Sequence, residues 1–139
     1  MKNYKPEHLD LFIRSCIENI YNDDMKNVNN EADLKNIMHY YLYPMLKNSN
    51  YKMRTEYIPK NFGQQKIDLS ILDKKENIIA ALEFKYSYID TPEVQKRIQN
   101  DETKLLKIIK RNPKSLCYAI WFDVDVNYKL DKRIELIEK

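Results

Sequence analysis

Hydrophobic residues recur at helical spacing in the first third of the chain. The apolar positions of residues 6–22 fall on one stripe, which consists of Leu9, Phe12, Ile13, Cys16, Ile17 and Ile20. A second stripe consists of Leu34, Ile37, Met38, Tyr41, Leu42 and Met45. Asn30 precedes this stripe as an N-cap residue, with Asp33 three residues further on, and Pro44 is expected to end or bend the helix near its last turn. The pattern therefore predicts two amphipathic helices.

After residue 50 the hydrophobic period changes to that of strands. Residues 52–58 predict a strand that stops at Pro59, and residues 66–73 predict a second strand. The polar stretch 73–77 predicts a turn, and the apolar run 78–85 that follows it is typical of a strand buried on both faces. The second and third strands are therefore expected to form a hairpin.

The last third of the chain returns to a helical pattern and then alternates again. Thr91 and Pro92 provide an N-cap and a first-turn proline for a long helix that reaches about Arg111. Residues 116–124 predict another buried strand, and residues at about 130–138 predict a short amphipathic helix. The order helix, helix, three strands, helix, strand, helix predicts an α/β domain with a mixed central sheet covered by helices.

Length and composition limit the class of protein. A chain of 139 residues, 43% hydrophobic and 32% charged, is expected to form a single folded domain over residues 1–139. No apolar run approaches the roughly eighteen residues of a membrane span, and the N-terminus lacks the apolar stretch of a secretory signal, so we expect a cytoplasmic protein. The net charge of +3 neither indicates nor opposes a polyanionic partner. Because Gly63 is the only glycine, a glycine-rich phosphate loop or dinucleotide fingerprint is excluded.

Cysteine and histidine do not indicate a metal centre or a disulfide framework. Cys16 and Cys117 both lie in apolar periodic segments and are expected to be buried free thiols. His8 and His39 are far apart in sequence and have no Cys-x-x-Cys beside them, so no zinc site is expected.

Charged residues interrupt the predicted strands at three places. Glu56 lies near the end of the first strand, Asp68 lies inside the second, and Glu83 and Lys85 close the third. Residues two apart in a strand project from the same face, so Glu83 and Lys85 share a face, and Asp68 in the partner strand can lie beside them. Because an unpaired buried charge costs several kcal/mol, this cluster of acids with one lysine calls for a physical explanation.

A divalent cation would explain the cluster. Mg²⁺, for which Mn²⁺ can substitute, prefers oxygen ligands and typically takes one or two carboxylates together with substrate phosphate oxygens. Asp68 and Glu83 could supply the carboxylates, the carbonyl of Phe84 could supply a third oxygen, and Lys85 could orient a water and help it to lose a proton. A second Glu-x-Lys tripeptide, Glu102-Thr-Lys104, lies in the predicted long helix, where residues two apart diverge, and it does not indicate a site.

These motifs resemble those of one known family. Ile67-Asp68-Leu69, followed fifteen residues later by Leu82-Glu83-Phe84-Lys85, resembles the PD-(D/E)xK nuclease superfamily, although Ile67 replaces the proline of the motif, as in many members. The predicted order of elements over about residues 31–124 resembles its restriction-endonuclease-like αβββαβ core, here with an extra N-terminal helix.

The resemblance implies specific roles for these residues. Asp68 and Glu83 would be metal ligands, Lys85 would be the catalytic lysine, and Gln95 is a candidate for the polar helix residue that often follows the motif. Glu56 or Glu31 would be the additional acid common in the family, and Glu56 is favoured for its position in a strand.

Each candidate also has a structural explanation. Asp68, Glu83 and Lys85 could form an internal salt bridge, Glu56 could pair across strands with Lys52, Arg54 or Lys66, and Gln95 and Glu31 could be solvated first-turn residues. Asp101, on the inward stripe of the long helix, is expected to be structural, and it could cap a neighbouring loop or pair with Lys104 or Lys66. The basic residues of that helix and its end could follow a phosphate backbone or form a solvated face, namely Lys96, Arg97, Lys104, Lys107, Lys110, Arg111 and Lys114.

These observations favour a metal-dependent endonuclease that hydrolyses phosphodiester bonds in DNA by an Mg²⁺-activated water. So small a domain would obtain sequence specificity from a homodimer, from a partner subunit or from recognition of shape. The alternatives are a catalytically inactive nuclease-like module for DNA binding or assembly, and an interaction protein whose acids are only salt-bridged. The sequence leaves the form of the substrate open.

Overall fold

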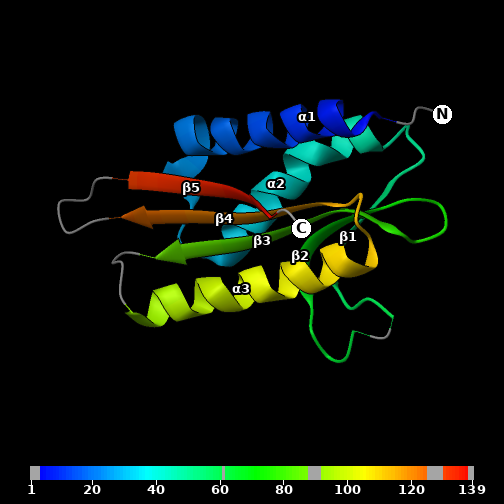
Figure 1. Cartoon of the computed structure of the whole chain (residues 1–139). Coiled ribbons are helices and arrows are strands. Elements are labelled where there is room, and N and C mark those ends of the chain that lie inside the picture. Colours follow the sequence, from blue (N-terminus) through cyan, green and yellow to red (C-terminus); the bar gives the residue numbers. More distant parts are fainter. Residues whose placement is uncertain (1–3, 61, 88–91, 125–129, 138–139) are drawn as a thin grey trace.

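The protein forms three layers, with a mixed sheet between helices. The computed structural model describes residues 4–60, 62–87, 92–124 and 130–137, with side chains described up to residue 122. In these residues α1 and α2 cover one face of a five-stranded sheet of order β1-β2-β3-β4-β5, and α3 covers the other (Figure 1). The elements are α1 (Pro6–Asn19), α2 (Glu31–Leu46), β1 (Lys52–Tyr57), β2 (Ile67–Leu72), β3 (Ile78–Ser87), α3 (Pro92–Arg111), β4 (Leu116–Val124) and β5 (Leu130–Ile137).

The sheet joins three antiparallel strands, β1 to β3, to the antiparallel pair β4–β5 through one parallel pair. β1–β2, β2–β3 and β4–β5 are antiparallel, and β3 runs parallel to β4. The long connection between β3 and β4 contains α3, as a parallel crossover requires. The α/β class and the mixed sheet predicted from the sequence are therefore confirmed.

The structure contains the helix cap and the turn that the sequence predicts. The side chain of Asn30 caps α2 by accepting a hydrogen bond of 2.9 Å from the backbone N–H of Asp33. Pro44 lies inside α2, two residues before its end. Asp73 closes the β2–β3 turn, because its carboxylate accepts from the backbone N–H groups of Lys75 and Asn77 at 2.9 Å each. Thr91, the predicted N-cap of α3, lies outside the described residues.

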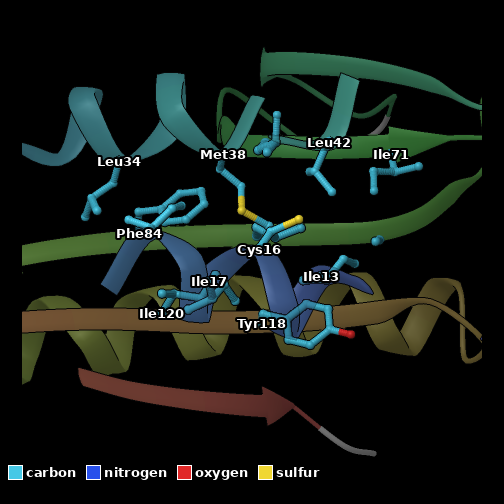
Figure 2. Close-up of a cluster of buried hydrophobic side chains, with 14 of the residues drawn as sticks. Ile13, Cys16, Ile17, Leu34, Met38, Leu42, Ile71, Phe84, Tyr118 and Ile120 are labelled. Carbon is cyan, nitrogen blue, oxygen red and sulfur yellow. The ribbon is translucent and has the colours of Figure 1, made fainter. Parts of the chain in front are cut away.

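The larger hydrophobic cluster fills the space between the sheet and the α1–α2 layer (Figure 2). Leu34 and Met38 of α2 lie near Phe84 of β3, whereas Leu42 lies near Ile71 of β2, and each of these side chains is at most 1% exposed. Cys16 of α1 belongs to the same cluster and is a free thiol, as is the buried Cys117. Burial raises the pKa of both thiols to about 11, so both are expected to be inert.

The smaller cluster lies beneath the C-terminal half of α3. It joins Leu105, Ile108 and Ile109 of α3 to buried residues of the sheet and of the loop before β2, namely Phe62, Ile67, Leu72, Ile78, Ala81 and Cys117. β3 is therefore buried on both faces, as its apolar run predicts: Ala80, Leu82 and Phe84 belong to the first cluster, whereas Ala81 belongs to the second.

The predicted helix at about 130–138 is wrong, because Leu130–Ile137 forms strand β5. Its register with β4 runs from Val124↔Leu130 to Cys117↔Ile137. Apolar residues at 130, 134, 136 and 137 suit a helical stripe and a strand almost equally, so periodicity alone could not decide. The decisive factor is tertiary, since β4 would otherwise carry a row of unpaired backbone groups along one edge.

None of the helices within the described ranges is long and apolar enough to cross a membrane.

Candidate functional site at the divergent end of the β2–β3 hairpin

The candidate site lies where β2 and β3 separate. Their register runs from Leu72↔Ile78 at the turn to Leu69↔Leu82, whereas β3 continues beside β4 as far as Ser87. The part of β3 beyond Leu82 thus has β4 along one edge and no β2 ladder along the other. Asp68, Glu83 and Lys85 lie at this open edge.

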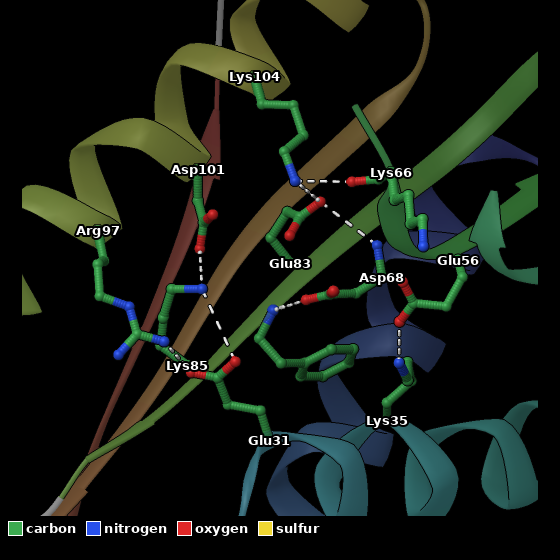
Figure 3. A network of polar contacts seen from close by, with 11 residues as sticks. Glu31, Lys35, Glu56, Lys66, Asp68, Glu83, Lys85, Arg97, Asp101 and Lys104 are labelled. Atoms are coloured by element: carbon green, nitrogen blue, oxygen red, sulfur yellow. Dashed lines mark hydrogen bonds and ion pairs between the residues drawn. The ribbon is translucent and has the colours of Figure 1, made fainter. Parts of the chain in front are cut away.

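Two carboxylates replace the missing strand-to-strand hydrogen bonds. Oδ2 of Asp68 accepts from the backbone N–H of Phe84 at 2.8 Å, and Oε1 of Glu83 accepts from the backbone N–H of Asp68 at 3.3 Å (Figure 3). Each acid therefore bonds to the backbone of the strand that carries the other acid. This exchange holds the two carboxylates side by side, as the spacing in the sequence predicts.

Glu83 is the most deeply buried acid of the site, with a side chain only 2% exposed. Its Oε1 also accepts from Nζ of Lys104 in α3 at 2.9 Å, and the same ammonium donates to the carbonyl of Lys66 at 2.7 Å. Burial and the neighbouring charge of Asp68 raise the pKa of Glu83 to about 8, although Lys104 opposes the shift. Without a further cation, Glu83 is therefore largely protonated at neutral pH.

Lys85 projects from the same face of β3 and meets α3 and the start of α2. Its Nζ lies 2.9 Å from Oδ2 of Asp101 and 3.9 Å from Oε2 of Glu31, which also pairs with Arg97 of α3 at 3.2 Å. Burial alone would lower the pKa of Lys85, but the hydrogen bond to Asp101 and the surrounding carboxylates outweigh it and raise the pKa. Lys85 is thus an ammonium ion and can act by its charge.

The two candidates for the additional acid occupy different positions. Glu31 contacts Lys85 directly, whereas Glu56 pairs with Lys35 of α2 and with none of the strand cations considered from the sequence. Glu56 has a positive φ of 53° at a point where β1 leaves its regular register with β2. Because Glu31 reaches Lys85, it has the stronger geometric claim to the role, and the choice between the two acids stays open.

Gln95 lies half-buried in the first turn of α3. Ile98 and Asp101 follow it along the side of α3 that faces the sheet. Gln95 is thus on the helix that supplies Asp101 and Lys104, and its role stays a prediction.

The donor set fits a divalent ion with few protein ligands. In the described part of the chain no three His, Cys, Asp or Glu side chains converge on one point, so a site here would use the pair Asp68 and Glu83. The N–H and C=O of one strand residue point to the same side. Since the N–H of Phe84 points to Asp68, its carbonyl faces the same open edge. Two carboxylates and one carbonyl are a suitable set for Mg²⁺, which keeps several waters.

A divalent cation would bind together with loss of the proton of Glu83, because only the ionised network carries more negative than positive charge. Within the described residues, the network contains four carboxylates and three basic groups, namely Asp68, Glu83, Asp101 and Glu31 against Lys85, Lys104 and Arg97. Asp68 is the acid of this network that forms no ion pair with any described residue. It is also half-buried, whereas Glu83 is fully buried, so a ligand would reach Asp68 first.

The space between β3 and α3 is closed. A cavity of only about 10 Å³ separates Glu83, Lys85, Ile98 and Asp101. A substrate therefore has to approach along the open edge of β3 and not between the strand and the helix. The larger hollows of about 270 to 360 Å³ in the described structure are lined by residues other than Asp68, Glu83 and Lys85.

Two members of the network have a function that the sequence did not indicate. Lys104 belongs to the Glu-x-Lys tripeptide that was set aside, yet it is the partner of Glu83. Asp101 was expected to cap a loop or to pair with Lys104 or Lys66, but it pairs with Lys85. The signal for both was their place on the inward stripe of an otherwise apolar helix face, since an acid there needs a buried partner.

Comparison of the chain with family models, with curated proteins and with solved structures finds no match in any of the three.

Proposed function

We propose that the protein is a metal-dependent nuclease that hydrolyses phosphodiester bonds in DNA, with the resemblance to the PD-(D/E)xK superfamily and its restriction-endonuclease-like fold as the guide. The observation that supports the proposal is the exchange of hydrogen bonds between Asp68 and Glu83, which holds two carboxylates and the Phe84 carbonyl at an unpaired strand edge beside Lys85. Mg²⁺ or Mn²⁺ is the expected cofactor.

The residues of the site have different roles in the proposed reaction. Bound Mg²⁺ would supply a Lewis acid that polarises the phosphodiester and lowers the pKa of an attacking water. Asp68 and Glu83 would hold the cation, and the Lys104 ammonium keeps the side chain of Glu83 in place through its contact of 2.9 Å. Lys85, held by Asp101, presents a positive charge to the water or to the phosphate oxygens, where charge develops during hydrolysis.

A second candidate is supported by the ion pairs themselves. Lys85 and Lys104 already contact Asp101 and Glu83, and the space between them is nearly filled. This arrangement also suits a nuclease-like module that binds DNA or assembles with another protein without cutting. The two candidates differ in one property, because the nuclease requires metal binding at Asp68 and Glu83 and the module does not.

Cleavage of linear, circular and branched DNA with Mg²⁺, Mn²⁺ or EDTA tests the proposal. Asp68→Asn, Glu83→Gln and Lys85→Met are expected to reduce metal-dependent cleavage by about 100-fold or more, since the first two remove ligands of the metal and the third removes the positive charge near the phosphate. Glu102→Gln is the matched control, because Glu102 belongs to the other Glu-x-Lys tripeptide and points from a helix. Equal cleavage by all variants would place the activity elsewhere.

Calorimetric titration with Mn²⁺ separates the two candidates when no cleavage is seen. Binding that is lost in Asp68→Asn but kept in Glu102→Gln supports the nuclease, whereas absence of binding in the wild type supports the non-cutting module. A requirement for a second copy or a partner subunit would be visible as cleavage that depends on protein concentration.

A further inference from the structure

A groove separate from the acidic site lies between α2 and the edge strand β1. Its volume is about 290 Å³, and its lining includes His39, Tyr43 and Lys47 from α2 and Lys52 and Arg54 from β1. His39, Tyr43 and Lys47 lie one helical turn apart. The register with β2 places Met53 on the face of β1 that α2 covers and Lys52 and Arg54 on the opposite face, so these two cations line the groove at the edge of the sheet. The groove therefore has one wall from each element.

Aromatic rings form part of the α2 wall. The rings of His39 and Tyr43 are nearly parallel, with an interplanar angle of 11° and centroids 6.2 Å apart. Tyr43 is 54% exposed, so part of its ring is accessible from the groove. Flat exposed rings offer stacking surfaces to the bases of unpaired nucleotides.

The charge of the groove has one sign. Lys47, Lys52 and Arg54 line it, and no Asp or Glu is among its lining residues in the described structure. Lys52 lies 3.7 Å from Glu76, whereas neither Lys47 nor Arg54 forms an ion pair with a described residue. Cations beside stacking rings are complementary to a chain that carries phosphates between flat bases.

The groove also points towards the acidic site. One turn before His39 on α2 is Lys35, and two residues after Arg54 on β1 is Glu56, and these two residues pair with each other. One further turn back is Glu31, which contacts Lys85 (Figure 3). The same two elements that form the groove therefore lead to the catalytic lysine of the proposed nuclease.

We propose that this groove binds a single-stranded segment of DNA, with bases stacked on His39 and Tyr43 and phosphates on Lys47 and Arg54. The choice of DNA rests on the proposed function, whereas the preference for unpaired nucleotides rests on the groove itself. A strand held here is guided along α2 and β1 to the open edge of β3. The protein thus recognises DNA that has a single-stranded region next to the bond to be cut.

Fluorescence anisotropy with a labelled oligothymidine of about 12 nucleotides tests the proposal. EDTA is present throughout, so that binding is measured without cleavage. Tyr43→Ala is expected to weaken binding by roughly tenfold, because one stacking surface is lost. Tyr40→Ala is the matched control and should change binding less than twofold, since Tyr40 is 75% exposed on the same helix but does not line the groove.

The salt dependence of binding provides a readout that a structural role would not change. Lys47→Ala and Arg54→Ala should each reduce the slope of log K against log salt by about 0.7, the value for one phosphate contact on a single strand. Lys26→Ala, an exposed lysine outside the groove, should leave the slope unchanged.

Several outcomes would overturn the proposal. Unchanged binding in Tyr43→Ala, or competition by polyglutamate as strong as that by oligothymidine, would exclude stacking recognition of a nucleic acid. Preference for duplex over single strand, tighter binding of oligouridine, or occupation of the groove by a second copy of the chain would each contradict it. Failure of the proposed nuclease would give a different result. The wild type and Asp68→Asn would both bind oligothymidine normally, and neither would cut DNA.

Discussion

The two halves of α3 cover the same sheet by different means. The C-terminal half packs Leu105, Ile108 and Ile109 into a cluster with apolar residues of the sheet. The N-terminal half places Asp101 on Lys85, and Lys104 between the halves pairs with Glu83. β3 shows the same change along its length, from alanine and leucine to glutamate and lysine.

The comparison indicates what the fold requires and what it does not. The C-terminal half of α3 packs on the sheet through an apolar cluster that contains no member of the charged network, so the charged half is not needed to form this packing. Replacing buried ion pairs by apolar residues is often neutral or stabilising. A fold selected only for stability would therefore extend the apolar cluster along all of β3, and the charges at its far end favour a function.

The largest expected effect concerns the pH dependence of stability. Folded Glu83 keeps its proton up to a pH of about 8, whereas unfolded chains lose it near 4.5. Unfolding thus releases a proton between these values, and the free energy of unfolding falls as the pH rises through this window, by at most about 1.4 kcal/mol per pH unit. Below 4.5 both states are protonated and the contribution is constant. Glu83→Gln should flatten the profile in urea titrations from pH 5 to 9.

Glu76→Gln provides the control for this measurement, because Glu76 is exposed in the β2–β3 turn. A wild-type profile as flat as that of Glu83→Gln would mean that Glu83 is ionised in the folded protein at neutral pH. The ion pairs between α3 and β3 would then be ordinary structural salt bridges.

Truncation in the apolar half should reduce stability without affecting the site. Leu105 is 0% exposed, so Leu105→Ala is expected to lower the free energy of unfolding by about 2 to 5 kcal/mol. Cleavage per folded molecule should stay near the wild-type value, because Leu105 belongs to the smaller hydrophobic cluster, which includes neither Asp68 nor Glu83. A large loss of activity at temperatures where the variant is fully folded would show that the two halves of α3 are coupled.

Removal of Lys104 should give a smaller loss that depends on pH. Lys104→Met leaves Glu83 without its cation, at a cost of about 1 to 3 kcal/mol when the carboxylate is charged. Below pH 8 Glu83 can take up a proton instead, so the loss measured by denaturant titration should be smaller at pH 6 than at pH 9. Lys107→Met, one turn away on α3, is the matched control. A loss independent of pH would mean that the alkyl chain of Lys104 matters and its charge does not.

The sequence predicts most of the fold because most of its signals are local. Asn30 caps α2 through a contact three residues away, and the Asp73 turn closes through residues up to four positions away. β5 was missed because its strand conformation depends on the free edge of β4, which is not visible in eight residues of ambiguous period.

The candidate site also combines local contacts, which the sequence predicts, with long-range contacts, which it does not. Asp68 and Glu83 lie close to each other because β2 and β3 form a hairpin with a short turn, and this closeness could be predicted. The partners Lys104 and Asp101 come from a helix that begins after the hairpin ends, so their pairing depends on how α3 lies across the sheet. The sequence restricts them to the inward stripe of α3 but does not assign the pairs.

The smallest expected effect on stability concerns Arg97, in the charged half of α3. Arg97 pairs with Glu31 at 3.2 Å, but its side chain is 58% exposed. Water and salt screen such a pair, so Arg97→Ala should lower the free energy of unfolding by less than about 1 kcal/mol. If the open edge of β3 receives DNA, the same variant should weaken DNA binding and lower its salt dependence, because Arg97 is a cation at that edge. Lys5→Ala, at the start of α1, is the control for both measurements. Loss of stability without any loss of binding would indicate that Arg97 is only a structural partner of Glu31 and that the DNA does not pass along α3.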